Sequence, residues 1–204
     1  MPIATETGGG ELQLPPTGAH VARCVQVIDL GTQKDTYMGK PKIIRKVRIG
    51  WELPNEKAIF NEERGEEPFM CGADYTLSLN ERANLRHILE SWRGKEFSAE
   101  ELKGFDLKVL VGKACMVTIL HKKSASNKNY AVVTTVTPVP KGMEVPKATL
   151  PKLSYDIEMG KNHVFDQLPE WIQNKIKTSE EFNSEFAGPP KENGEAPDKD
   201  NEVF

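Results

Sequence analysis

The 204-residue chain is poor in cysteine and has no long apolar run. Its three cysteines, Cys24, Cys71 and Cys115, are far apart and form no C-x-x-C pair. Disulfide frameworks and zinc ribbons need paired spacing, so we expect buried, reduced thiols and no metal site. No apolar run approaches the ~18 residues that span a bilayer. Residues 1–16 show neither the basic nor the apolar region of a secretory signal, and we expect a soluble protein.

The sequence also lacks the short motifs of the common enzyme classes. It contains no P-loop, no dinucleotide-binding glycine pattern after a strand, no G-x-S-x-G and no H-E-x-x-H. A metal-dependent nuclease would need strand carboxylates that point at one ion, and Asp29, Glu52 and Asp74 would converge only by chance. We therefore expect no enzyme and no cofactor.

The charge is unevenly distributed along the chain. The overall net charge is -3, but residues 179–204 hold eight acids and two lysines, a net charge of -6. The remaining residues therefore carry +3. A basic body with an acidic tail is typical of proteins that act on nucleic acid.

Hydrophobic periodicity predicts five strands and one main helix. The helix follows the third strand, with Asn80 as its cap, apolar residues at i, i+3, i+4 and i+7, and Gly94 at its end. Ser98 and Glu101 form a capping box for a short second piece. Residues 31–42 and 54–68 have the composition of exposed loops. The expected strands cover residues 19–29, 43–53, 69–79, 113–122 and 129–137.

This order of elements predicts a mainly β fold. Three strands, a helix and two further strands are the order of an OB-fold, a five-stranded Greek-key barrel with the helix between strands three and four. Other small α+β sandwiches share this order. We expect a flexible arm over 1–16, the OB-fold-like domain over 17–142, a Pro-rich C-terminal extension with one short helix over 143–186, and a disordered acidic tail over 187–204.

Basic residues gather where an OB-fold binds its ligand, on the second strand and on the loops that join strands one to two and four to five. Lysines and arginines at these places release counterions from a phosphate backbone. A charged run is also typical of a solvated strand face. The prediction of a nucleic-acid site therefore depends on finding basic residues in both of these segments. The candidates are Lys34, Lys40, Lys42, Arg45, Lys46 and Arg48, against the single acid Asp35, and His121, Lys122, Lys123 and Lys128 in the later segment.

Aromatic rings near these segments are candidates for stacking on unpaired bases, which favours single-stranded DNA as the ligand. They are Tyr37, Tyr75 and Tyr130. Tyr75 shares the parity of Leu77 and Leu79, so core packing is an equal alternative for it.

The tail is the second candidate site. Its last residues alternate acids with apolar residues and end in an aromatic residue, a pattern that can occupy a basic pocket of a partner protein. A purely solubilising tail is the alternative, but a terminal aromatic residue adds nothing to solubility. The expected partner-binding residues are Glu195, Asp198, Asp200, Glu202 and Phe204.

Several stretches resemble the single-stranded DNA-binding proteins of tailed bacteriophages, which have an OB-fold body and an acidic tail ending in phenylalanine. They are GAHVARCVQVIDLGTQ, RIGWELP, YTLSLNERANLRHILESWRGKEFSAEELKGFDL and VPKG, which together cover much of residues 18–142. The resemblance implies protection of single strands during phage DNA replication or recombination in the cytoplasm of the infected bacterial host. It also implies recruitment of replication or recombination proteins by the tail. The sequence departs from the family at Lys191 and Lys199, which interrupt the acids.

One function of a different class stays open. The barrel would then bind a protein, as an interaction module or phage accessory factor without DNA binding. The oligomeric state, including a homo-oligomer, also stays open.

Overall fold

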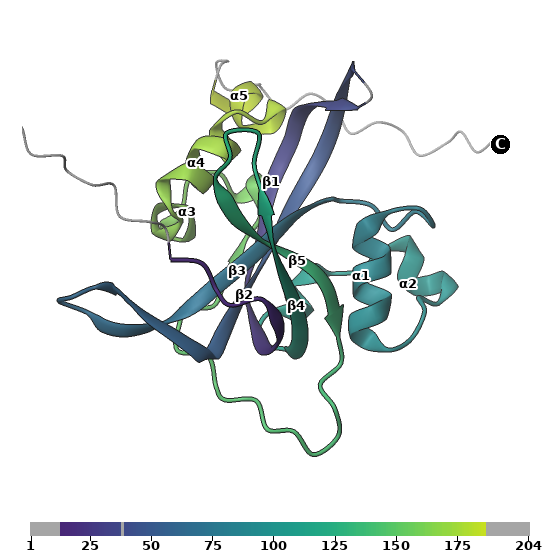
Figure 1. Ribbon diagram of the computed structural model, residues 1–204. Helices are drawn as coiled ribbons and strands as arrows, with labels where there is room; N and C mark the ends of the chain where they lie inside the picture. The colour runs from purple at the N-terminus through teal and green to yellow at the C-terminus, as the bar shows by residue number, and fades with distance from the viewer. Residues whose placement is uncertain (1–12, 38, 187–204) are drawn as a thin grey trace, which may run out of the picture.

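A computed structural model describes residues 13–37 and 39–186, and it is mainly β. An antiparallel sheet of five strands in the order β3-β2-β1-β4-β5 curls into a half-barrel (Figure 1). A short sixth strand, β6, pairs in parallel with β1. The strands are β1 (Gly18–Tyr37), β2 (Lys40–Asn61), β3 (Gly65–Thr76), β4 (Ala114–Lys123), β5 (Asn129–Thr137) and β6 (Leu153–Tyr155).

Helices flank the sheet on two opposite sides (Figure 1). The first group lies between β3 and β4 in the chain and consists of α1 (Asn84–Arg93), α2 (Ala99–Lys103) and the 3-10 turn η1 (Leu107–Leu110). The second group follows β6 and consists of η2 (Ile157–Met159), α3 (His163–Gln167), α4 (Glu170–Lys177) and α5 (Glu180–Phe186). No helix in the described part of the chain is both long and apolar enough to cross a membrane.

The two segments expected as loops are instead continuous hairpins. β1 and β2 stay paired as far as Tyr37 and Lys40, and β2 and β3 stay paired as far as Asn61 and Gly65. Gly39, with φ of 76°, lies at the first turn, in a left-handed conformation that glycine adopts without strain. Polar composition failed as a loop signal here because cross-strand hydrogen bonds satisfy the backbone of an exposed hairpin just as well.

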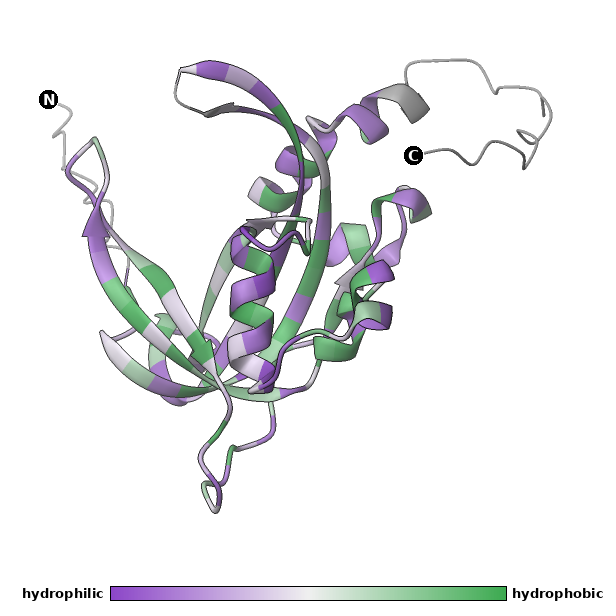
Figure 2. Cartoon of the chain, turned by 90° about the vertical axis from the view of Figure 1, so that its right-hand side faces the viewer, coloured by the Kyte–Doolittle hydropathy of each residue, from purple (hydrophilic) through white to green (hydrophobic). Residues whose placement is uncertain are grey.

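The main core contains alternate residues of β2, as the period of two in a strand requires. Val47, Ile49, Trp51 and Leu53 are all buried, and successive residues between them face outward or pack elsewhere. In Figure 2 the strands show the same alternation of hydrophobic and hydrophilic residues. Trp51 lies with its ring centroid 6.1 Å from that of Trp92 on α1, so this helix closes the core.

The caps of the helices were partly predicted. Gly94 adopts the left-handed conformation at the end of α1, and Ser98 and Glu101 form the capping box of α2. The expected start of α1 was wrong. Ala83 occupies the N-cap. The Asn80 side chain instead accepts a hydrogen bond from the Arg82 backbone amide in the preceding turn, and asparagine favours such turns as much as it favours helix caps.

The C-terminal extension contains three α-helices, where the sequence predicted one. They build a second core on the outer side of β1, against Ile28 and Leu30, which face away from the first core. The apolar residues of this core are spread over several short elements, so no single helical period in the sequence predicted the core. The residues that complete it are Leu153, Tyr155, Ile157, Phe165, Leu168, Ile172, Ile176 and Phe182.

Two opposed side chains hold the connection to this extension. Arg23 and Glu52 are partners in the β1–β2 register. Arg23 donates to the carbonyl oxygens of Val145 and Pro146 at 2.8 and 2.6 Å. Glu52 is fully buried and accepts from the backbone amides of Thr149 and Leu150. Glu52 therefore fixes the segment that leads into β6 against the sheet.

The three cysteines are free and buried, as expected. Burial raises the pKa of the Cys24 and Cys71 thiols to about 12. The thiols are therefore protonated and unreactive at neutral pH. The tail and most of the N-terminal arm, 187–204 and 1–12, lie outside the described residues.

Candidate nucleic-acid interface

Two hairpins extend from the sheet toward the same end of the molecule, the top of Figures 1 and 2. One joins β1 to β2, and the other joins β4 to β5. They carry nearly all of the candidate DNA-binding residues from the sequence, but their basic side chains have very different surroundings.

Three of the six cations of the β1–β2 region are paired with acids of the same sheet. Lys46 Nζ lies 2.6 Å from an oxygen of Asp35, and Arg45 lies 2.6 Å from Asp29. Arg48 on β2 lies 2.7 Å from Asp74, its register partner on β3. The sequence suggested Asp35 alone as a counter-charge because Asp29 and Asp74 lie outside the basic segment of residues 34–48. These pairs leave Arg45, Lys46 and Arg48 less available to a phosphate than expected.

The pairing also shows in the titration of the groups. The hydrogen bond from Lys46 lowers the pKa of Asp35, and the bond to Asp29 raises the pKa of Arg45. Burial alone would raise the pKa of Asp74, but Lys175 and Arg48 outweigh it and hold that pKa below its usual value of 3.8. The carboxylates of Asp35 and Asp74 are therefore ionised at neutral pH, and their ion pairs persist.

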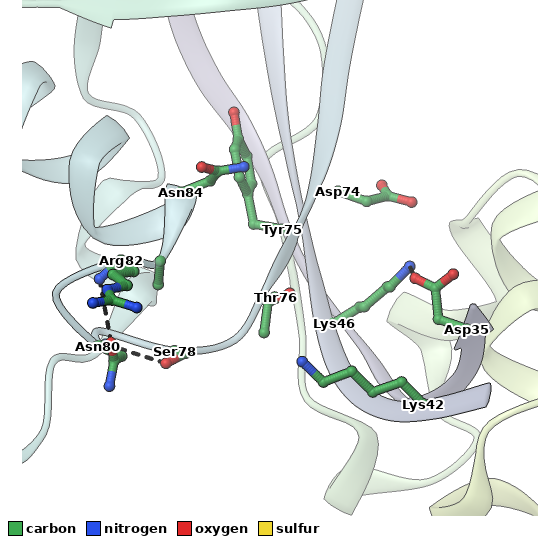
Figure 3. Close-up of a pocket in the computed structure, with 11 residues that line it drawn as sticks. Asp35, Lys42, Lys46, Asp74, Tyr75, Thr76, Ser78, Asn80, Arg82 and Asn84 are labelled. Carbon is green, nitrogen blue, oxygen red and sulfur yellow. Dashed lines mark hydrogen bonds and ion pairs between the residues drawn. The ribbon is translucent and has the colours of Figure 1, made fainter. Parts of the chain in front are cut away.

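Lys34, Lys40 and Lys42 are exposed near the end of the same hairpin. Lys42 lines a cleft of about 410 Å³ between the hairpin and the loop that leads into α1. Figure 3 shows Lys46 beside Asp35, with Ser78, Asn80 and Arg82 on the opposite loop. The cleft is polar and holds cations and acids together, and its lining residues are Asp35, Lys42, Lys46, Asp74, Tyr75, Thr76, Ser78, Asn80, Arg82, Ala83 and Asn84.

The β4–β5 hairpin has no such neutralisation. No acidic residue occurs in residues 107–143, so its cations have no counter-charge of their own segment. Lys122, Lys123 and Lys128 are exposed, and no carboxylate pairs with them in residues 13–37 and 39–186. Tyr130 lies directly opposite Lys122 and is 44% exposed. Since opposed residues share one face of an antiparallel pair, the side chains of Tyr130 and Lys122 project from the same face of the hairpin.

The predicted phosphate contact at His121 is not favoured by the structure. Its Nε2 lies 2.8 Å from the carbonyl oxygen of Pro15. A carbonyl oxygen only accepts, so the ring nitrogen donates. His121 therefore holds the N-terminal segment against the end of β4, a contact across more than a hundred residues that local sequence could not reveal.

The three candidate tyrosines fall in different environments. Tyr75 is buried in the main core, 8% exposed, and so cannot offer its ring to a base. The packing alternative for Tyr75 was the right one, because its register partner Val47 faces the core. Tyr37 ends β1, but its side chain lies outside the described residues. Of the two tyrosines whose side chains the structure describes, only Tyr130 keeps its predicted role open, and the prediction for Tyr37 remains untested.

Sequence reasoning missed the exposed ring of Trp171. Trp171 lies on α4 next to Ile172, and Ile176 follows one turn later. The two isoleucines are buried, but Trp171 is 52% exposed. The sequence does contain a cue for this exposure, because Trp171 lies beside the apolar stripe of α4 that Ile172 and Ile176 form.

Comparisons with known proteins add no relative: the sequence matches no protein-family model and no curated protein. Within the described ranges, no three or more histidine, cysteine, aspartate or glutamate side chains group together so as to hold a metal ion.

Proposed function

We propose that the protein binds single-stranded DNA without sequence specificity, on an OB-fold-like body, and protects it during phage DNA replication or recombination. The observation that carries the proposal is the β4–β5 hairpin, on which three unpaired lysines accompany an exposed tyrosine. The curled five-stranded antiparallel sheet is consistent with an OB-like barrel.

Each part of this hairpin suits a part of a single strand. The lysines replace condensed cations at phosphates, which contributes affinity that falls with salt, with a slope of about -0.7 per phosphate. Tyr130 offers a ring to an unstacked base, a contact of about 1–3 kcal/mol that any base can make. Duplex DNA offers the phosphates but not the base faces. Lys34, Lys40 and Lys42 would extend the contact along the β1–β2 hairpin.

The test is a titration of the full chain with fluorescently labelled oligo-dT over a salt series, beside a duplex of equal length. We expect oligo-dT to bind more tightly than the duplex and its affinity to fall steeply as salt rises. If the protein binds neither DNA at low salt, the proposal is wrong and the protein-interaction module becomes the better hypothesis.

The tail carries a separate part of the proposal. We propose that Glu195, Asp198, Asp200, Glu202 and Phe204 recruit replication or recombination proteins and that the acidic tail also competes with DNA for the basic surface. Deleting 187–204 should tighten oligo-dT binding, most visibly at low salt. Deleting Phe204 alone should leave DNA binding unchanged but weaken capture of partners from infected-cell extract. Unchanged binding after the larger deletion would rule out the competition.

A further inference from the structure

The half-exposed indole of Trp171 is held in a fixed position by the sheet beneath α4. The guanidinium carbon of Arg48 lies 4.5 Å from the centroid of its ring, a cation–π contact. Arg48 comes from β2, so the ring lies over the outer face of the sheet. A planar guanidinium stacks well on an aromatic face. One face of the indole is therefore occupied by Arg48, while half of the side chain remains exposed to solvent.

Arg48 is itself fixed from two sides. Asp74 accepts its hydrogen bond at 2.7 Å and also pairs with Lys175 of α4. Gly72 on β3 leaves space for it, because a Cβ at this position would lie 2.7 Å from a guanidinium nitrogen. The guanidinium thus lies between the backbone of β3 and the ring of Trp171. A ring held in this way loses little conformational entropy when a ligand stacks on it.

The ion-pair cluster beneath Trp171 carries one net positive charge, from Arg48 and Lys175 against Asp74. Glu170, the exposed chain neighbour of Trp171, lies in the first turn of the same helix. The two hydrophobic residues that anchor α4, Ile172 and Ile176, lie in the second core, so the helix does not need the indole to bury its apolar side.

We propose that Trp171 forms a base-stacking site for single-stranded nucleic acid, with Arg48 supporting one face of the indole and a nucleobase stacking on the exposed side. The proposal rests on the proposed function but assigns part of the binding surface to the C-terminal extension. Arg48 then acts mainly as the support of the ring.

The sequence provides a direct reporter. The chain has three tryptophans, and Trp51 and Trp92 are buried in the main core. Stacking of a base on an indole quenches its emission, so only Trp171 can respond by direct contact. Titration of the full chain with oligo-dT should quench the exposed fraction of tryptophan emission in parallel with binding measured by the anisotropy of a labelled oligo-dT.

Variants separate stacking from a structural role. W171L should weaken oligo-dT binding by about fivefold or more, and W171F should restore much of it, because phenylalanine keeps a ring. F60L is the matched control, since Phe60 is another exposed ring, 45% exposed, near the acids of the β2–β3 hairpin. Melting temperatures of all variants show whether α4 stays docked.

The results distinguish this inference from the proposed function. Quenching on binding, together with a W171L defect and F60L binding as the parent does, supports the stacking site. Oligo-dT that binds by anisotropy without quenching, or W171L that binds as tightly as the parent, overturns the stacking site and leaves the proposed function standing. An unaltered protein that binds no oligo-dT overturns both. Should W171L fail to fold, the quenching of the unaltered chain still decides.

Discussion

The β1–β2 and β4–β5 hairpins are both rich in basic side chains, but carboxylates of the described residues pair with three cations of the first and with no lysine of the second. On the β1–β2 side, Arg45, Lys46 and Arg48 each contact a carboxylate. On the β4–β5 side, Lys122, Lys123 and Lys128 have no acidic residue in their segment. Counting charges along the chain made the first hairpin look the stronger site, whereas the structure favours the second.

The difference shows that availability, more than number, decides whether a cation can serve a ligand. A lysine in an ion pair must first leave its partner carboxylate before it binds a phosphate, so part of the free energy of phosphate binding is lost. Fully exposed pairs contribute only about 0.2–1 kcal/mol each. The three β1–β2 pairs are partly buried, so their cations are weakened as ligands for a phosphate. The comparison between the hairpins can be tested at four levels.

The largest effect should come from K122A/K123A/K128A. Loss of three phosphate contacts at about 0.7 per contact lowers oligo-dT affinity by about a hundredfold at 0.1 M salt and flattens the salt slope by about 2. The measurement is a salt series of anisotropy titrations. A matched control, K57A/K95A/K103A, removes three exposed lysines elsewhere and should bind nearly as the parent does. Equal losses in the two variants would show that net charge alone matters.

Removal of the ring opposite Lys122 in the β4–β5 register should have the next largest effect. Y130A should lose about 1–3 kcal/mol of oligo-dT binding, because its exposed ring stacks on a base. Y75F is the control: the Tyr75 hydroxyl is buried without a hydrogen-bond partner in the described structure, so its removal should change neither DNA binding nor the melting temperature for the worse. A defect in Y75F but not in Y130A would reverse the assignment.

Release of a paired cation should have a smaller effect of opposite sign. D35N removes the partner of Lys46 and one negative charge from the cleft wall, so oligo-dT affinity should rise about twofold to fivefold at low salt. K46A in the parent should change affinity by less than K122A does. If D35N binds no better at any salt, the pairing is not what weakens the β1–β2 hairpin.

The smallest effect concerns acid stability. The pKa of Asp74 is lowered in the folded protein, so its stabilisation is full above the unfolded value of 3.8 and is lost as pH falls through the lower folded value. The parent should therefore lose stability on acidification below about pH 4, and D74N should lose about 1 kcal/mol less. Urea unfolding at pH 7 and pH 3 measures both. An identical loss in the two proteins would mean that Asp74 does not titrate in this range.

Patterns of short range predicted the correct parts of the fold. The alternation at Val47, Ile49 and Trp51, the stripe of α1 and the capping box at Ser98 are local, and burial or capping follows directly from them. The candidate surface was predicted only as far as exposure follows from charge, which holds for Lys122, Lys123 and Lys128.

Partners that are distant in the chain were beyond the reach of the sequence. Asp74 meets Arg48 through the β2–β3 register and meets Lys175 through the docking of α4. His121 meets Pro15, and Trp171 comes to lie over Arg48. None of these contacts leaves a periodic signal, because each depends on how separate elements pack.

The sequence by itself determined which residues could be buried and which would be charged, since period-2 and period-3.6 alternation dictate the faces of strands and helices. Only the tertiary structure decided which charges are neutralised and which rings remain open to a ligand. The reason is physical: a hydrophobic face can pack against any apolar surface, whereas an ion pair or a stacked ring requires two particular groups within a few ångströms of each other.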